Sequence, residues 1–201
     1  MINITSLCRS FDKEIIKNLD LSLPSEGFIS ICGPSGCGKS TLLRILAGLD
    51  TEYKGIIEPS PKNMRISMAF QEPRLLPWRT AAENVNLVMG DKNATLDKAA
   101  EILLELGFEK QDLTKLPDEL SGGMKARVSL ARALAISDAQ LYILDEPFAS
   151  LDGKTARLCA DVIRRRTSHA LCLSVIHDTE LAHEISDAVL YCNGLPISEI
   201  K

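Results

Sequence analysis

The stretch FISICGPSGCGKSTLLRILAGL (28–49) decides the fold of this chain. Its apolar start reads as a buried strand, its end has helical periodicity, and the turn between them matches the pattern G-x-x-x-x-G-K-[ST]. Glycines let the backbone curl so that successive N–H groups point at phosphate oxygens, and the start of the helix adds its positive dipole end. The sequence therefore predicts a phosphate-binding loop made of Gly33, Pro34, Ser35, Gly36, Cys37, Gly38, Lys39, Ser40 and Thr41.

Three side chains of this loop have expected roles toward a bound nucleotide. Lys39 would bridge the β- and γ-phosphates, the Ser40 hydroxyl would ligate Mg²⁺, and Thr41 would contact the α-phosphate. The alternative is a glycine-rich turn that precedes a helix and binds nothing. A chance match with a strand before it and a helix after it is rare, so we expect a nucleotide site.

Outside the loop, short apolar runs alternate with segments of helical periodicity, which is the pattern of α/β proteins. Most of the runs are nearly continuous, as in parallel strands that are buried on both faces. The expected parallel strands are 28–32, 141–145, 170–176 and 188–192, and the expected helices are 39–48, 121–136, 154–167 and 178–186. Residues 2–11 and 55–70 alternate more, so we expect an antiparallel flank there.

The middle of the chain has no strand-like run between residues 80 and 116. Thr80 and Glu83 have the spacing of a capping box at a helix start, and LDKAAEILLELG (96–107) predicts a helix that Gly107 ends. We therefore expect a single domain over 1–201. It would be an α/β P-loop NTPase core with a mainly parallel sheet, an antiparallel β flank, and a helical subdomain inserted at about 72–135.

The composition excludes several classes of protein. The 23 Lys+Arg against 27 Asp+Glu give a net charge of −4, so we expect no nucleic-acid partner. No apolar run reaches the ~18–20 residues of a membrane span, and the N-terminus lacks the pattern of a secretory signal. The six cysteines form no CxxC pair and lie mostly in apolar runs, as free thiols do in a reducing cytosol. We expect a cytoplasmic protein.

Two carboxylates, Asp145 and Glu146, end the apolar run LYILDEP (141–147). Ligands of open parallel sheets bind outside the carboxyl ends of the strands. Asp145 is therefore expected to hold Mg²⁺ through water, and Glu146 to orient and deprotonate the attacking water. A strand that ends in a solvated acidic turn is the alternative, and the phosphate loop makes it the weaker one.

The segment LSGGMKARVSLARAL (120–134) predicts a second anion site. Ser121 can cap a helix, and Gly122 and Gly123 leave its first N–H groups open to close approach. Because the chain has one phosphate loop, we expect this helix end to bind the nucleotide of another subunit. A helix cap without a ligand is the alternative.

Together these motifs resemble the ATP-binding cassette (ABC) ATPases, and among them the nucleotide-binding subunits of bacterial importers. GPSGCGKST resembles Walker A, LSGGM the family signature and LYILDE Walker B, and they follow the family's order over essentially the whole chain. The resemblance implies ATP and Mg²⁺ as cofactors and ATP hydrolysis as the reaction. It also implies a head-to-tail homodimer that sandwiches two ATPs between one subunit's Walker A and the other's signature.

Four more positions take their roles from the resemblance. Gln71, in AFQEP, is similar to the glutamine that meets Mg²⁺ and the attacking water. His177, in SVIHD, is similar to the histidine that contacts the γ-phosphate, and Asp152, in FASLD, resembles the loop that contacts the partner across the dimer. Phe11 matches the aromatic residue that stacks on adenine, and a place in the hydrophobic core is its alternative.

The resemblance also implies partners and a location. Separate membrane permease subunits would hold the cassette at the inner face of the cell membrane, and a solute-binding protein would act indirectly. QEPRLLPW (71–78) resembles the branch that imports nitrate, sulfonates and taurine, with importers of pyrimidine precursors nearby. Trp78 and Arg74 would lie where the permease docks, and a place in the core of the helical subdomain is the alternative for Trp78.

Two other functions share part of this pattern. A small-molecule P-loop kinase also begins with a strand, a phosphate loop and a helix, but it has no use for LSGG or His177. A non-transport cassette ATPase that acts on DNA or ribosomes would carry long coiled-coil insertions or tandem cassettes, which 201 residues do not hold.

Overall fold

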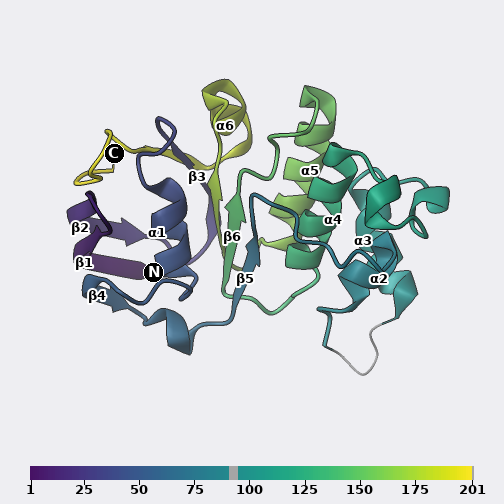
Figure 1. Ribbon diagram of the computed structural model, residues 1–201, viewed down its shortest axis with the longest axis horizontal. Helices are drawn as coiled ribbons and strands as arrows, with labels where there is room; N and C mark the ends of the chain where they lie inside the picture. The colour runs from purple at the N-terminus through teal and green to yellow at the C-terminus, as the bar shows by residue number, and fades with distance from the viewer. Residues whose placement is uncertain (91–94, 201) are drawn as a thin grey trace.

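A five-stranded parallel sheet forms the centre of the protein (Figure 1). The computed structural model describes residues 1–90 and 95–200. The strand order is β5-β6-β7-β3-β8, and every residue of β6 and β7 is buried, as their near-continuous apolar sequences require. The strands are β3 (Gly27–Cys32), β5 (Ile66–Ala69), β6 (Leu141–Asp145), β7 (Leu171–Val175) and β8 (Ala188–Tyr191).

A smaller antiparallel sheet has the order β2-β1-β4. It consists of β1 (Ile2–Ser10), β2 (Glu14–Leu23) and β4 (Lys54–Glu58). The predicted antiparallel flank is therefore confirmed for the two stretches that form β1 and β4. The prediction is wrong for residues 66–69, because β5 pairs in parallel with β6 at the edge of the main sheet.

Strand β2 lies in a segment for which the sequence predicted no element. Its fully buried side chains are Ile16, Leu19 and Leu23, whose spacing resembles that of a helix rather than the alternation of a strand. Asn18 has a positive φ of 50°, and the register with β1 shifts next to it. A β-bulge thus breaks the alternation that would reveal the strand.

Helices cover both faces of the parallel sheet. Helix α1 (Lys39–Leu46) lies between the two sheets, where its leucines share a hydrophobic cluster with Leu141 and Ile143 of β6 (Figure 1). The alternate residues Tyr142 and Leu144 belong to a second cluster with helix α5 (Gly153–Arg166) and helix α6 (Thr179–Ile185). The alternation of side chains along β6 therefore builds two cores, one on each face.

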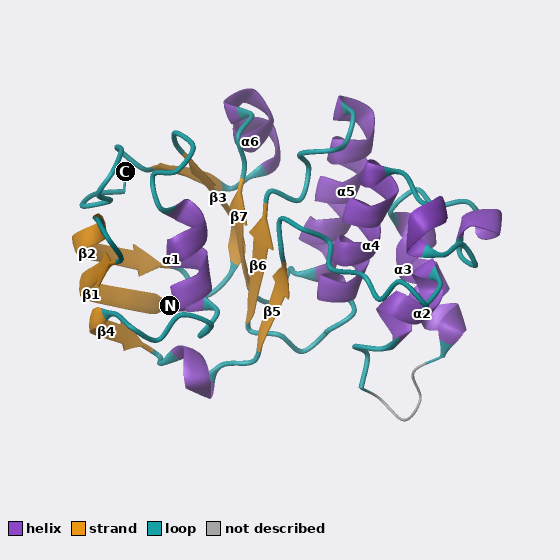
Figure 2. Cartoon of the chain, in the orientation of Figure 1, coloured by secondary structure: helices purple, strands orange, loops and turns teal. Residues whose placement is uncertain are grey.

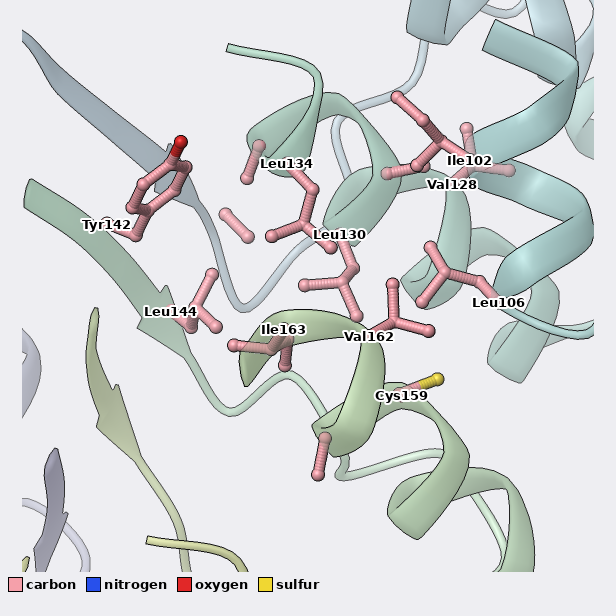
Figure 3. Close-up of a cluster of buried hydrophobic side chains, with 14 of the residues drawn as sticks. Ile102, Leu106, Val128, Leu130, Leu134, Tyr142, Leu144, Cys159, Val162 and Ile163 are labelled. Atoms are coloured by element: carbon pink, nitrogen blue, oxygen red, sulfur yellow. The ribbon is translucent and has the colours of Figure 1, made fainter. Parts of the chain in front are cut away.

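A group of helices lies beside α5 and beyond it, on the side away from the antiparallel sheet (Figure 2). They are α2 (Ala81–Asn86), α3 (Leu96–Glu105) and α4 (Gly122–Leu134), with short 3₁₀ turns between α3 and α4. Among the described residues no strand occurs between β5 and β6. Apolar side chains from the end of α3, from α4 and from α5 meet in one cluster with β6, as Figure 3 shows.

The predicted helix boundaries in this region are confirmed. The Thr80 side chain accepts a hydrogen bond from the Glu83 N–H at 3.2 Å, and the Glu83 carboxylate accepts one from the Thr80 N–H at 2.9 Å. Helix α3 ends just before Gly107, which has a φ of 80°. Across residues 1–90 and 95–200, no helix combines the length and the apolar character that a membrane crossing needs.

Candidate functional site

A pocket of about 310 Å³ lies against the phosphate loop. Its walls come from the loop and α1, from the segment after β5, and from the turns that follow β6 and β7. Most of the predicted phosphate-loop residues, together with Gln71, Glu146 and His177, therefore share one cavity. The lining residues are Ile15, Ser35, Gly36, Gly38, Lys39, Ser40, Thr41, Gln71, Glu146 and His177. Ile15 is the one that the sequence analysis missed, because it lies on β2.

Two glycines of the loop are required by its geometry. Gly33 has a φ of 148°, and a Cβ atom there would lie 2.9 Å from the carbonyl oxygen of Cys192. Gly38 has a φ of 109°, and its Cβ would lie 2.7 Å from a methyl carbon of Ile15. A larger residue at either position would strain the backbone and displace the neighbouring chain.

Lys39 is buried beneath the loop, with 5% of its surface exposed. Its Nζ donates hydrogen bonds to the carbonyl oxygens of Gly33 and Pro34, both at 2.8 Å, and lies 3.7 Å from the Sγ of buried Cys37. The carbonyl oxygens of the loop thus hold the ammonium group, and Lys39 is part of the pocket lining. The positive charge of Lys39 would attract an anion such as a phosphate group to this pocket.

Ser40 and Asp145 meet at the carboxyl end of β6. The Ser40 hydroxyl donates a hydrogen bond to Asp145 Oδ1 at 3.2 Å, which joins the start of α1 to β6. Burial raises the pKa of Asp145 above its ordinary value of 3.8, and the Ser40 hydrogen bond opposes this effect. A hydroxyl and a carboxylate oxygen at this distance are the kind of ligands that Mg²⁺ takes in proteins.

This burial makes a pH-dependent prediction for an Asp145→Asn variant. Because the pKa of Asp145 is raised in the folded protein, the acid favours folding only while it is protonated, and this contribution is lost as the pH rises from 3.8 through the folded pKa. The variant keeps the acceptor for Ser40 and carries no charge. Without nucleotide it should therefore melt higher than the parent at pH 7, by about 2–4 °C per kcal/mol recovered, and the gap should close at low pH. Equal melting temperatures at pH 7 would contradict this account.

Glu146 and His177 form a pair on the lining of the pocket. His177 Nε2 lies 2.7 Å from Glu146 Oε1, a hydrogen bond between the ring and the carboxylate. Glu146 has a positive φ of 54°, a conformation that costs energy in a residue other than glycine. Asp145 and Val175 are register partners on β6 and β7, so the turns that follow these strands bring the two side chains together.

The signature residues lie outside the lining of this pocket. Ser121 is exposed and caps α4, since its hydroxyl accepts a hydrogen bond from the Met124 N–H at 3.2 Å. Outside its own helix and its chain neighbours, a Cβ at Gly122 would meet no atom of the described residues within 4 Å, whereas one at Gly123 would lie 2.7 Å from the Ser150 carbonyl oxygen. The first glycine thus leaves the helix end open, and the second allows the loop before α5 to approach it.

Asp152 and Phe11 also lie outside the pocket lining. Asp152 caps α5, accepting hydrogen bonds from the N–H groups of Lys154 and Thr155 at 3.0 Å, and hydrogen bonds with Thr155 lower its pKa. Phe11 is 58% exposed, and the Arg9 guanidinium lies over its ring, 4.0 Å from the centroid. A place in the hydrophobic core is therefore excluded for Phe11.

Residues 16–149 match the ABC transporter family. The chain belongs to this family. It is an ATP-binding cassette, an ATPase of transporters, and not a small-molecule kinase.

Relatives and solved structures agree with this assignment. An aliphatic sulfonates import ATP-binding protein of Agrobacterium fabrum is 40% identical over 197 residues, which cover 94% of this chain and 74% of the relative. A protein of Bacillus subtilis with the same description is 35% identical and is covered to 73%, with 93% of this chain. A dimeric ATP-binding cassette in a post-hydrolysis state with ADP and phosphate has a TM-score of 0.87 at 26% identity, over 100% of this chain and 98% of that chain. The likeness confirms the predicted fold class.

Proposed function

We propose that this cassette hydrolyses ATP in the pocket around its phosphate loop and thereby drives a membrane importer of aliphatic sulfonates. The observation that carries the proposal is the hydrogen-bonded pair of Glu146 and His177, which faces the same cavity as Lys39. A candidate base and a phosphate-binding cation on one cavity are what the hydrolysis of a bound triphosphate needs.

The phosphate loop and α1 are assigned to the triphosphate. Lys39 would turn its Nζ from the two carbonyl oxygens that it now contacts toward the β- and γ-phosphates, and Thr41 would contact the α-phosphate. Ser40 would hold Mg²⁺ directly and Asp145 through water, with Gln71 at the edge of the same pocket. The bound metal supplies charge neutralisation at the phosphates.

Glu146 is assigned as the general base. Its carboxylate would take the proton of the attacking water. His177 would contact the γ-phosphate, and its Nε2 would hold the Glu146 carboxylate in place. The positive φ of Glu146 supports this assignment, because strained backbone persists where the surrounding structure holds a side chain in a required direction.

The signature residues Ser121, Gly122 and Gly123 are assigned to the nucleotide of a second copy of the chain. An open helix end that lies outside its own pocket supports this assignment, as does the dimeric state of the similar cassette structure. In such a head-to-tail dimer Asp152 would face the partner, and Phe11 would stack on adenine with the ring face that Arg9 does not cover.

The remaining parts of the proposal concern the assembly. Residues 1–201 would act as one cassette, with the helices within about 72–135 as its helical subdomain. Separate permease subunits would hold it at the inner face of the cell membrane, and a solute-binding protein would deliver the substrate to them. The names of the relatives favour aliphatic sulfonates over nitrate and pyrimidine precursors.

Reconstitution tests the proposal. Purified cassette, permease and solute-binding protein in vesicles should take up an aliphatic sulfonate when Mg²⁺-ATP is supplied on the cassette side. Nitrate and a pyrimidine precursor serve as competing solutes, and a Lys39→Ala cassette serves as the inactive control. Uptake that continues with the control cassette, or that favours a competing solute, would contradict the proposal.

Trp78 makes a prediction about the permease contact. Its side chain is 70% exposed, which excludes the core alternative, and Pro77 beside it is exposed as well. A Trp78→Ala variant should therefore fold and bind ATP like the parent, while its assembly with the permease weakens. Co-purification with the permease and nucleotide titration measure the two properties. A loss of ~3–5 kcal/mol in the free energy of unfolding, as for the removal of a buried aromatic side chain, would contradict this prediction.

A further inference from the structure

The exposed Trp78 is presented by a closed turn. Leu76 to Arg79 form a β-turn in which the Arg79 N–H donates a hydrogen bond to the Leu76 carbonyl oxygen at 3.1 Å. Pro77 occupies the second position, which its fixed φ suits, and Trp78 the third. The turn follows Gln71 of the ATP pocket by a few residues, so one segment joins the pocket to this exposed indole.

A single buried side chain holds the backbone of this turn through hydrogen bonds. Asn84, on α2, is 1% exposed, and its Oδ1 accepts a hydrogen bond from the Leu76 N–H at 2.8 Å. Its Nδ2 donates to the carbonyl oxygens of Leu76, Arg79 and Thr80 at 3.2, 2.9 and 3.1 Å. Only an amide offers both a donor and an acceptor in this arrangement, so the contacts specify asparagine by chemistry rather than by volume.

The platform under the turn is itself fixed. Helix α2 begins with the Thr80–Glu83 capping box, and the N–H groups of Ala81 and Ala82 donate to carbonyl oxygens of residues 115 and 113 at 2.9 and 3.0 Å. Asn84 therefore attaches the turn to a helix that is itself capped and hydrogen-bonded in place.

The other end of the segment is tied to the signature helix. The Arg74 carbonyl oxygen accepts a hydrogen bond from Arg132 of α4 at 2.8 Å, and the Arg74 guanidinium lies over Phe70, 4.6 Å from the ring centroid. Arg74 has a positive φ of 46°. Residues 74 to 80 are thus held both to α2 and to α4.

We infer that Asn84 is the positioning residue of the permease-docking turn. It keeps the backbone that carries Trp78 ordered before the permease arrives, so that assembly does not bear the cost of ordering the turn. The occupant is a short cytoplasmic segment of the permease that presents an apolar side chain to the indole. The choice of this occupant rests on the proposed function, because an ATPase of transporters must receive its permease at an exposed surface. The ordering of the turn by Asn84 is independent of the proposed function.

The single tryptophan of the chain makes the ordering directly measurable. In the isolated cassette, the time-resolved fluorescence anisotropy of Trp78 reports the motion of the turn together with the local motion of the exposed indole. In an Asn84→Ala variant the fast component should rise, while the circular dichroism spectrum and the basal ATPase rate stay at parent values. The matched control is Asn86→Ala on the same helix, because the Asn86 Oδ1 has no hydrogen-bond partner among residues 1–90 and 95–200. Unchanged motion in Asn84→Ala, or equal loosening in Asn86→Ala, would overturn the inference.

An isosteric variant separates hydrogen bonding from packing. Asn84→Asp keeps the volume and the acceptor but places a carboxylate against three carbonyl oxygens, so it should loosen the turn as alanine does. Parent-like anisotropy in Asn84→Asp would show that volume alone matters and would overturn the inference. Should both variants fail to fold, hydrogen exchange of the parent decides: the Leu76 amide must be strongly protected, and exchange at the rate of a free loop amide would overturn the inference.

A permease titration distinguishes this inference from the proposed function. Asn84→Ala should bind the permease at least about tenfold more weakly, with Asn86→Ala at parent affinity. If Asn84→Ala loosens the turn but binds the permease as the parent does, the preorganisation is overturned. If Trp78→Ala also binds as the parent does, the proposed docking surface itself is wrong, while the ordering of the turn by Asn84 stands.

Discussion

A Glu146→Gln variant is expected to bind ATP and to hydrolyse it about 10²–10⁴-fold more slowly than the parent, because the amide cannot accept the proton of the attacking water. Glutamine keeps the shape of the side chain and a carbonyl oxygen toward His177 Nε2, which lies 2.7 Å from the present carboxylate. The loss should therefore appear in kcat, with the affinity for nucleotide near its parent value.

Single-turnover hydrolysis and nucleotide titration measure the two quantities. A matched control is Glu180→Gln, which removes an exposed carboxylate at the start of α6 and should leave both quantities unchanged. A Glu146→Gln protein that turns over at the parent rate would show that another group takes the proton.

A Lys39→Ala variant should fail one step earlier, at nucleotide binding. Its Nζ is the buried cation of the pocket, and charge-assisted hydrogen bonds to phosphate are about twice as strong as neutral ones. Loss of hydrogen bonds worth about 1.5–3 kcal/mol each corresponds to at least a tenfold weaker affinity. Without bound ATP the variant should also fail to dimerise.

The comparison requires a folded variant, which circular dichroism establishes. Lys62→Ala, at an exposed position away from the pocket, is the matched control and should bind ATP as the parent does. Parent-like affinity in Lys39→Ala would contradict the assignment of the phosphate loop.

The phosphate loop is the part of the site that sequence predicts best, because its geometry is local. The positive φ values of Gly33 and Gly38 and the burial of Lys39 arise within one strand-turn-helix unit. Asp145 and Glu146 could be placed nearly as well, because they end a run of residues that is too apolar to be anything but a buried strand.

Features that depend on distant pairing could not be read from the chain. The contact between Glu146 and His177 spans 31 positions and exists because β6 and β7 are neighbours in the sheet. The parallel pairing of β5 with β6 depends on the same kind of information, and a bulge at Asn18 hides β2. The sequence left a core position open for both Phe11 and Trp78, and only their exposed fractions in the structure exclude it.

The central claim is that two copies of the chain share each ATP, and the mass of Glu146→Gln in solution tests it most directly. Light scattering after gel filtration should give a monomer of 22.0 kDa without nucleotide and twice that mass with Mg²⁺-ATP. Ser121→Arg in the same background should restore the monomer, because it blocks the exposed helix end that would meet the partner's ATP. A Glu146→Gln protein that binds ATP and remains at 22.0 kDa at high concentration would contradict the account.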